Sequence, residues 1–214
     1  MNPSHRLEDL NRAANRRIAK LRARVSNLKL PVNFDDDARV AWTVIEARNL
    51  WAGFLRAYYL SGAIRTRTRS GKPVRFTSRV FPDLESALRF AVRLKNPSFQ
   101  RPRITRYDEP PWHNTKNFIK VHQKVGATNL SQIYAALGIG SGFIQRLTDL
   151  RNFYAHRCDE TFRAAANVGV SLGFSTKPEL RATKILCSRL PKRPQNVITD
   201  WLDDMANVFD LLCS

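Results

Sequence analysis

One short stretch of the chain carries side chain types that could do chemistry. Residues 147–160 read LTDLRNFYAHRCDE and bring Arg151, Asn152 and His156 close together in a chain that has only four histidines. Histidine titrates near neutral pH and can donate or accept a proton, while arginine keeps its charge and grips a phosphate with two N–H groups. Cleaving RNA without a metal requires proton transfer at the 2′-hydroxyl and the leaving oxygen, together with positive charge on the phosphate. These residue types therefore indicate phosphodiester chemistry.

The spacing of arginine and histidine has to be judged by context, because it occurs twice. Arg106 precedes His113 across two prolines, which exclude a helix and leave the two side chains without a fixed relation. Arg151 precedes His156 within a helical pattern of apolar residues, so Asn152 and His156 are neighbours on one face. Arg151 lies about 140° around that helix from His156. A purely structural alternative remains, since a basic residue at a helix C-terminus is often stabilising.

The charge balance favours a nucleic-acid partner. The chain of 214 residues has 36 basic and 18 acidic residues, a net charge of +18, and 26 of its basic residues are arginines. Arginine binds phosphate and stacks on bases, so we expect RNA as the partner. The sequence contains no 18-residue apolar run and no signal-peptide pattern, which predicts a cytoplasmic protein without a membrane partner. The three cysteines are widely spaced, so neither a metal site nor a cofactor is predicted.

Apolar periodicity predicts a mostly α fold, a bundle of about five to seven helices with little β structure. The expected helices cover 4–29, 35–61, 83–95, 114–124, 129–137, the stretch after Ser141 and 195–212. Residues 168–192 contain VGVSLGF and TKILC, which are typical of strands or irregular structure. We expect one domain over 1–214, with 63–112 as a basic loop or insert.

That insert contains a predicted basic hairpin with a Ser-Gly turn. In an extended conformation alternate residues share one side, which places cations along an arm. The candidate RNA-binding residues of this arm are Arg65, Arg67, Arg69, Lys72, Arg75 and Arg79. Phe76 would be available to stack on a base. The alternative is a solvated charged loop, and charge alone does not separate RNA from DNA.

Two segments resemble the HEPN superfamily (higher eukaryote and prokaryote nucleotide-binding). They are the Arg-Asn-x-x-x-His motif at 151–156 and the helix IEARNLWAGFLRAYYLSGA at 45–63. The resemblance implies a homodimer with a composite site, a metal-independent endoribonuclease, and products with 2′,3′-cyclic phosphate and 5′-hydroxyl ends. It also implies a toxin or anti-phage defence effector with an antitoxin or neighbouring-gene partner.

The resemblance suggests roles for individual residues. His156 would be the general acid and base, Arg151 the phosphate clamp and Asn152 the orienting residue. An acidic residue from an early helix often supports such sites, and Glu46 is the candidate here, pairing Arg151 or fixing an imidazole. Tyr154 is a further supporting candidate, although a core or interface role suits it better. The stripe of the early helix that carries Glu46 could instead face solvent.

Two alternatives stay open on the sequence alone. The first is a non-catalytic RNA-binding or assembly module of a defence or toxin–antitoxin system, which would use the same motif only for holding RNA or for dimerisation. The weaker second alternative is a DNA-binding regulator, because residues 129–147 permit a helix-turn-helix. Loss of toxicity on His156→Ala would favour the nuclease, and binding to duplex DNA would favour the regulator.

Overall fold

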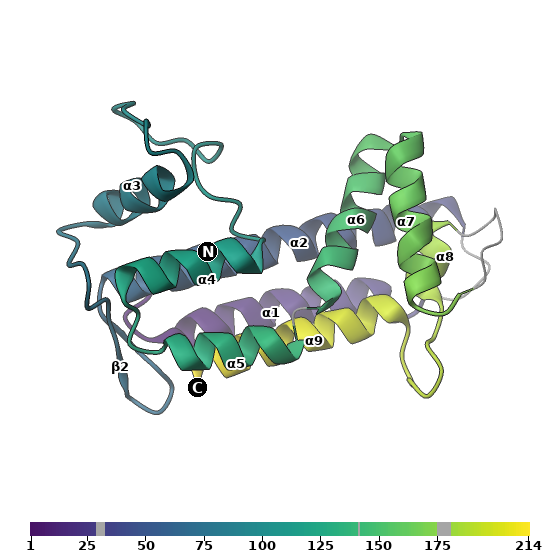
Figure 1. Ribbon diagram of the computed structural model, residues 1–214. Coiled ribbons are helices and arrows are strands. Elements are labelled where there is room, and N and C mark those ends of the chain that lie inside the picture. Colours follow the sequence, from purple (N-terminus) through teal and green to yellow (C-terminus); the bar gives the residue numbers. More distant parts are fainter. Residues whose placement is uncertain (29–32, 141, 175–180) are drawn as a thin grey trace. The chain divides into compact units, whose positions relative to one another are not determined.

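The computed structural model describes residues 1–28, 33–140, 142–174 and 181–214 (Figure 1). Over these ranges it contains nine helices and a single pair of short strands, which confirms a mostly α chain with little β structure. Contacts between residues divide the chain into two compact units. Unit 1 comprises 1–15, 50–139 and 208–214, and unit 2 comprises 16–49 and 140–207. The expectation of one domain over 1–214 stays a prediction.

Three long helices contribute a whole turn or more to each unit: α1 (Leu7–Val25), α2 (Phe34–Ala63) and α9 (Val197–Cys213). The start of α2 follows from its sequence, since the side chain of Asn33 accepts the Asp36 N–H at 2.8 Å and acidic residues fill the first turn. We expected the first helix to continue to residue 29 and to end at Pro31. The helix instead ends at Val25, and residues 29–32 lie outside the described ranges.

The core of unit 1 is aromatic. Phe209 of α9 stacks on Phe54 and Trp51 of α2, with ring centroids 3.7 and 5.5 Å away. Tyr58 of α2 packs against Phe118 of α4 (Thr115–Val125) at 5.9 Å and donates a hydrogen bond to the Leu212 carbonyl. The end of α9 also lies beside α5 (Leu130–Gly140), where the Gln132 amide donates to the Leu211 carbonyl (Figure 1). Burial of these rings supplies the main stabilisation of the unit.

Capping residues begin α3 and α4 in unit 1 and end α4. Asp83 accepts the Ser86 N–H at 2.7 Å and starts α3 (Leu84–Lys95), and Asn114 accepts the Asn117 N–H at 3.2 Å to start α4. Gly126 ends α4 in the left-handed region with φ 65°. A Cβ at Gly126 would clash with the hydroxyls of Thr77 and Ser78, so only glycine fits that turn.

The predicted hairpin is present in unit 1. Strand β1 (Thr66–Arg67) pairs antiparallel with β2 (Pro73–Val74), with Thr66 opposite Val74. Gly71 takes φ 83° in the turn, as the Ser-Gly dipeptide predicts. The hairpin is tied to both terminal segments, because the Arg67 N–H donates to the His5 carbonyl and the Arg69 N–H to the Cys213 carbonyl.

The proline-rich connection after α3 is anchored by one buried carboxylate. Glu109 accepts hydrogen bonds from Arg56 Nε at 2.6 Å, from Trp112 Nε1 at 2.7 Å and from Arg106 at 3.1 Å. A buried charge requires such partners, so this cluster holds the connection against α2. Arg106 therefore has a structural task.

Unit 2 contains α6 (Gly142–His156), α7 (Asp159–Ser171) and α8 (Ala182–Cys187), and α6 packs along α7 (Figure 1). The prediction of strands or irregular structure within 168–192 is wrong for 168–171 and 182–187, which are helical. A short apolar run does not distinguish a buried strand from a buried helix face. Here Ala165, Val168 and Gly169 form the buried face of α7. These two helices raise the number above the predicted five to seven.

Candidate functional site

The motif helix α6 ends at the candidate histidine. His156 is the last residue of α6, and Arg157 follows in the left-handed region with φ 46°, its N–H bonded to the Phe153 carbonyl at 2.9 Å. That conformation stops the helix and turns the chain away. The His156 side chain is exposed there, while Arg157 forms an ion pair with Asp37 of α2 at 3.8 Å. His156 is therefore accessible to a substrate, and it also occupies the helix end that the structural alternative requires.

The other two motif residues are joined to each other. Arg151 donates a hydrogen bond from Nη1 to Asn152 Oδ1 at 3.3 Å, and both side chains are half-buried. The Arg151 Nε is buried and has no hydrogen-bond partner within the described ranges. Asn152 lies one helical turn before His156, on the same face of α6. The structure thus brings Arg151 and Asn152 together and places His156 one turn beyond them.

Sequence reasoning missed a third basic residue of this cluster. Arg48 of α2 is half-buried, and its pKa is lowered from the ordinary value of arginine, first by burial and then by the nearby charge of Arg151. Two like charges held in a partly desolvated place repel each other, which disfavours the charged form of Arg48. An arginine within the largely apolar sequence of α2 was the signal that could have revealed it.

The predicted pairing of Glu46 with Arg151 is wrong. Glu46 forms an ion pair with Arg17 of α1 at 3.8 Å and accepts a hydrogen bond from Asn49 at 3.3 Å. The reason lies in the helix geometry: positions 46 and 48 are separated by about 200° around α2. Because Arg48 lies near Arg151, Glu46 faces a different side of the helix. The alternative role of Glu46, fixing an imidazole, stays a prediction.

Tyr154 is a buried support of the motif helix. Its hydroxyl shares a hydrogen bond of 2.7 Å with the hydroxyl of Thr183 in α8, and Thr183 in turn donates to Asp37 of α2. Burial raises the pKa of Tyr154 above its ordinary value, so the phenol stays protonated. The chain of contacts from Tyr154 to Asp37 connects the last turn of α6 to two other helices. Tyr154 therefore positions the helix end that carries His156.

The predicted arm belongs to unit 1, and its cations lie on the surface. Thr66 and Thr68 are buried, and all the candidate cations are exposed, as the predicted alternation requires: Arg65, Arg67, Arg69, Lys72, Arg75 and Arg79. Arg69 forms an ion pair with Asp210 at 3.2 Å. The expectation that Phe76 stacks on a base is wrong, because Phe76 is buried and stacks on Tyr59 at 5.4 Å.

Neither a membrane-spanning helix nor a metal centre is found among the described residues. No helix within the described residues is long and apolar enough to cross a membrane. Across the same part of the chain, no group of three or more His, Cys, Asp or Glu side chains is arranged to hold a metal ion. The helix-turn-helix that the sequence permits over 129–147 would have its junction at residue 141, outside the described ranges.

No protein-family model, curated protein or solved structure matches the chain, so the HEPN resemblance stays a prediction.

Proposed function

We propose that the chain is a metal-independent endoribonuclease whose site is completed by a second copy. The observation that carries this proposal is the cluster in unit 2: the half-buried arginines Arg48 and Arg151, Asn152 bonded to Arg151, and the exposed His156 one turn further along α6. A phosphate near the two guanidinium groups would offset their repulsion.

The roles follow from the chemistry of each group. The arginines hold the scissile phosphate and neutralise the charge that develops as the 2′-oxygen attacks phosphorus. The 2′-hydroxyl loses its proton to a base, the bond to the 5′-oxygen breaks, and that oxygen gains a proton. The products are a 2′,3′-cyclic phosphate and a 5′-hydroxyl. One histidine does not serve as base and acid at the same instant, so a homodimer that joins two motifs supplies both.

The biological setting that suits this activity is a toxin or defence effector with a neutralising partner. An RNA-cleaving enzyme endangers its own cell, which favours a cognate antitoxin or a neighbouring-gene partner. The net charge of +18 suits an acidic protein for that task. The exposed cations of the arm would bind the phosphates of the RNA backbone independently of its sequence.

Cleavage of RNA in the presence of EDTA tests the proposal. The wild-type chain is compared with His156→Ala and Arg151→Ala, and His5→Ala is the matched control because His5 is an exposed histidine in unit 1. We expect cleavage by the wild type and the control, loss in both motif variants, and cyclic phosphate ends. Equal cleavage by His156→Ala and His5→Ala would refute the assignment. A mixture of the His156→Ala and Arg151→Ala chains tests the shared site: cleavage that returns in the mixture would support a site built from two copies.

One observation favours a second candidate, the non-catalytic RNA-binding module. Within the described part of the chain the His156 side chain makes no hydrogen bond or ion pair, so no protein group orients its ring. A catalytic imidazole usually has such an orienting partner. RNA binding that survives in His156→Ala, with no cleavage by the wild type on several RNAs, would support the module.

A further inference from the structure

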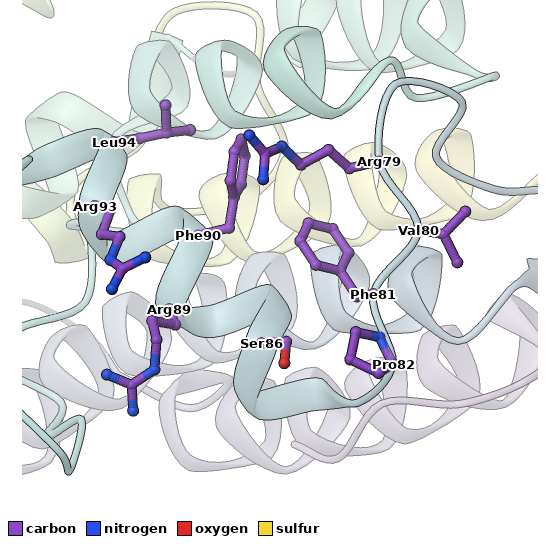
Figure 2. Close-up of a pocket in the computed structure, with 9 residues that line it drawn as sticks. All are labelled: Arg79, Val80, Phe81, Pro82, Ser86, Arg89, Phe90, Arg93 and Leu94. Atoms are coloured by element: carbon purple, nitrogen blue, oxygen red, sulfur yellow. The ribbon is translucent and has the colours of Figure 1, made fainter.

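A second candidate binding site lies in unit 1, at the start of α3. The segment before α3 and the exposed side of the helix enclose a cavity of about 460 Å³ (Figure 2). That volume falls within the range of small-ligand sites. Three arginines and two phenylalanines contribute to its lining, and none of the residues that line it is acidic. The cavity therefore combines flat apolar surface with positive charge.

The two rings form the aromatic part of the cavity. Phe81 comes from the segment before α3 and Phe90 from the helix, and their ring centroids are 5.6 Å apart at an interplanar angle of 53°. Both rings are only half-buried, so solvent reaches part of their surface (Figure 2). The guanidinium of Arg79 lies over Phe90, 4.7 Å from its centroid. A planar base has both an aromatic face and a guanidinium face available for stacking here.

The remaining two arginines differ in how firmly they are held. Arg89 is fixed by bonds of 2.8 Å to Glu85 and to the carbonyls of Arg101 and Pro102. Arg93, one turn further along α3, is exposed and makes no ion pair within the described residues. Arg93 is therefore the cation with unused N–H donors for a phosphate, whereas the charge of Arg89 is already paired with Glu85.

We propose that this cavity binds one unpaired nucleotide of an RNA strand, with the base against Phe81 and Arg79 and a phosphate on Arg93. An acidic peptide would satisfy the arginines and leave the flat aromatic surface unused, whereas a nucleotide uses both. Arg79 is also the last cation of the arm, so a strand that follows the arm arrives at the cavity. The choice of RNA as the strand rests on the proposed function, and the cavity itself fits a base and a phosphate.

The test measures binding rather than cleavage. Every chain carries His156→Ala, and the probe is a short fluorescein-labelled oligouridylate, with a blunt RNA duplex of the same length as the second probe. The variants are Arg93→Ala, which removes the phosphate partner, and Phe81→Leu, which keeps an apolar side chain and removes the ring. Arg16→Ala on α1 is the matched control, because Arg16 is an exposed helical arginine outside the cavity. Circular dichroism confirms that each variant is folded.

We expect Arg93→Ala and Phe81→Leu each to weaken oligouridylate binding about fivefold or more, as loss of a stacked or phosphate-bound nucleotide implies. Arg16→Ala and the duplex probe should show a much smaller change. Equal weakening by Arg93→Ala and Arg16→Ala, or equal losses for the oligouridylate and the duplex, would overturn the proposal. A negative cleavage assay would count against the nuclease and would leave this comparison unaffected, so the two failures are distinguishable.

Discussion

His122 in unit 1 and His156 in unit 2 occupy opposite surroundings. His122 of α4 is buried among Tyr58, Tyr59 and Phe118, its Nδ1 is 2.9 Å from the Phe118 carbonyl, and its Nε2 has no hydrogen-bond partner in the described part of the chain. Burial lowers the pKa of His122 to about 4. His156 is exposed at a helix end. The same residue type is thus a neutral core group in one unit and a solvent-exposed side chain in the other.

The arginines show the same contrast. The cations of the arm are hydrated, and each contributes little to stability and a general attraction to phosphate. Arg48 and Arg151 are half-buried, and burial together with the nearby charge of Arg151 lowers the pKa of Arg48. A residue's position in the tertiary structure, more than its type, separates a structural or general role from a specific one.

The largest expected effect concerns the two histidines in catalysis. His156→Gln should lower the rate of RNA cleavage by about 100-fold or more, the usual loss for a general acid or base. His122→Leu, which fills the same core space, should leave the rate at neutral pH close to that of the wild type. Single-turnover cleavage of one RNA by both variants measures this difference. A similar loss in both variants would remove the distinction between the two histidines.

The buried His122 should make the stability of the folded chain depend on pH. The pKa of His122 is about 4 in the folded chain and about 6.5 when unfolded, so the unfolded state binds more protons between these values. Stability from this group is present above pH 6.5 and is lost as the pH falls toward 4. We expect a loss on the order of 2 kcal/mol between pH 7 and pH 5.

Urea denaturation of the wild type, His122→Leu and His156→Ala at both pH values measures that loss. The carboxylates contribute equally to all three chains, so the difference between variants isolates the histidine. His122→Leu should lose less stability than the wild type on acidification, and His156→Ala is the control at an exposed position. An unchanged pH profile in His122→Leu would show that another group controls acid stability.

A smaller effect is expected from the buried support of the motif helix. Thr183→Val keeps the shape of the side chain but removes the hydroxyl that joins Tyr154 to Asp37. The loss should be about 1–2 kcal/mol of unfolding free energy, because the Tyr154 hydroxyl stays buried without that partner. Urea denaturation measures it, with Thr148→Val on the same unit as the control, since that hydroxyl bonds only to the Ile144 carbonyl of its own helix.

The smallest effect concerns the residue after His156. Arg157 has φ 46°, a conformation that glycine adopts without steric cost. Arg157→Gly and Arg157→Ala both remove the ion pair with Asp37, and only the alanine keeps the Cβ. The glycine variant should therefore be more stable than the alanine variant by about 0.5–1 kcal/mol. Thermal unfolding of the pair tests this, and an alanine variant of equal or greater stability would contradict the backbone argument.

Much of the local structure follows from short-range patterns. The helix that carries the motif, the Ser-Gly turn and the exposure of Arg65, Arg67 and Arg69 were all predicted from apolar spacing or alternation. The strands expected near 168–192 were not found where α7 and α8 lie, because a short apolar run has the same appearance in either structure. The sequence pattern also did not predict the burial of Phe76 against Tyr59, since that burial depends on a contact between distant segments.

By itself the sequence determined the chemistry that is available: a surplus of arginine, one Arg-Asn-x-x-x-His motif, and amphipathic helices to carry them. The tertiary structure decided which of these groups meet. It brought Arg48 close to Arg151 and paired Glu46 with Arg17. It also buried His122 and left His156 exposed at the end of α6. The physical reason is that helix periodicity depends on neighbouring residues, whereas burial and the field of nearby charges depend on segments far apart in the chain.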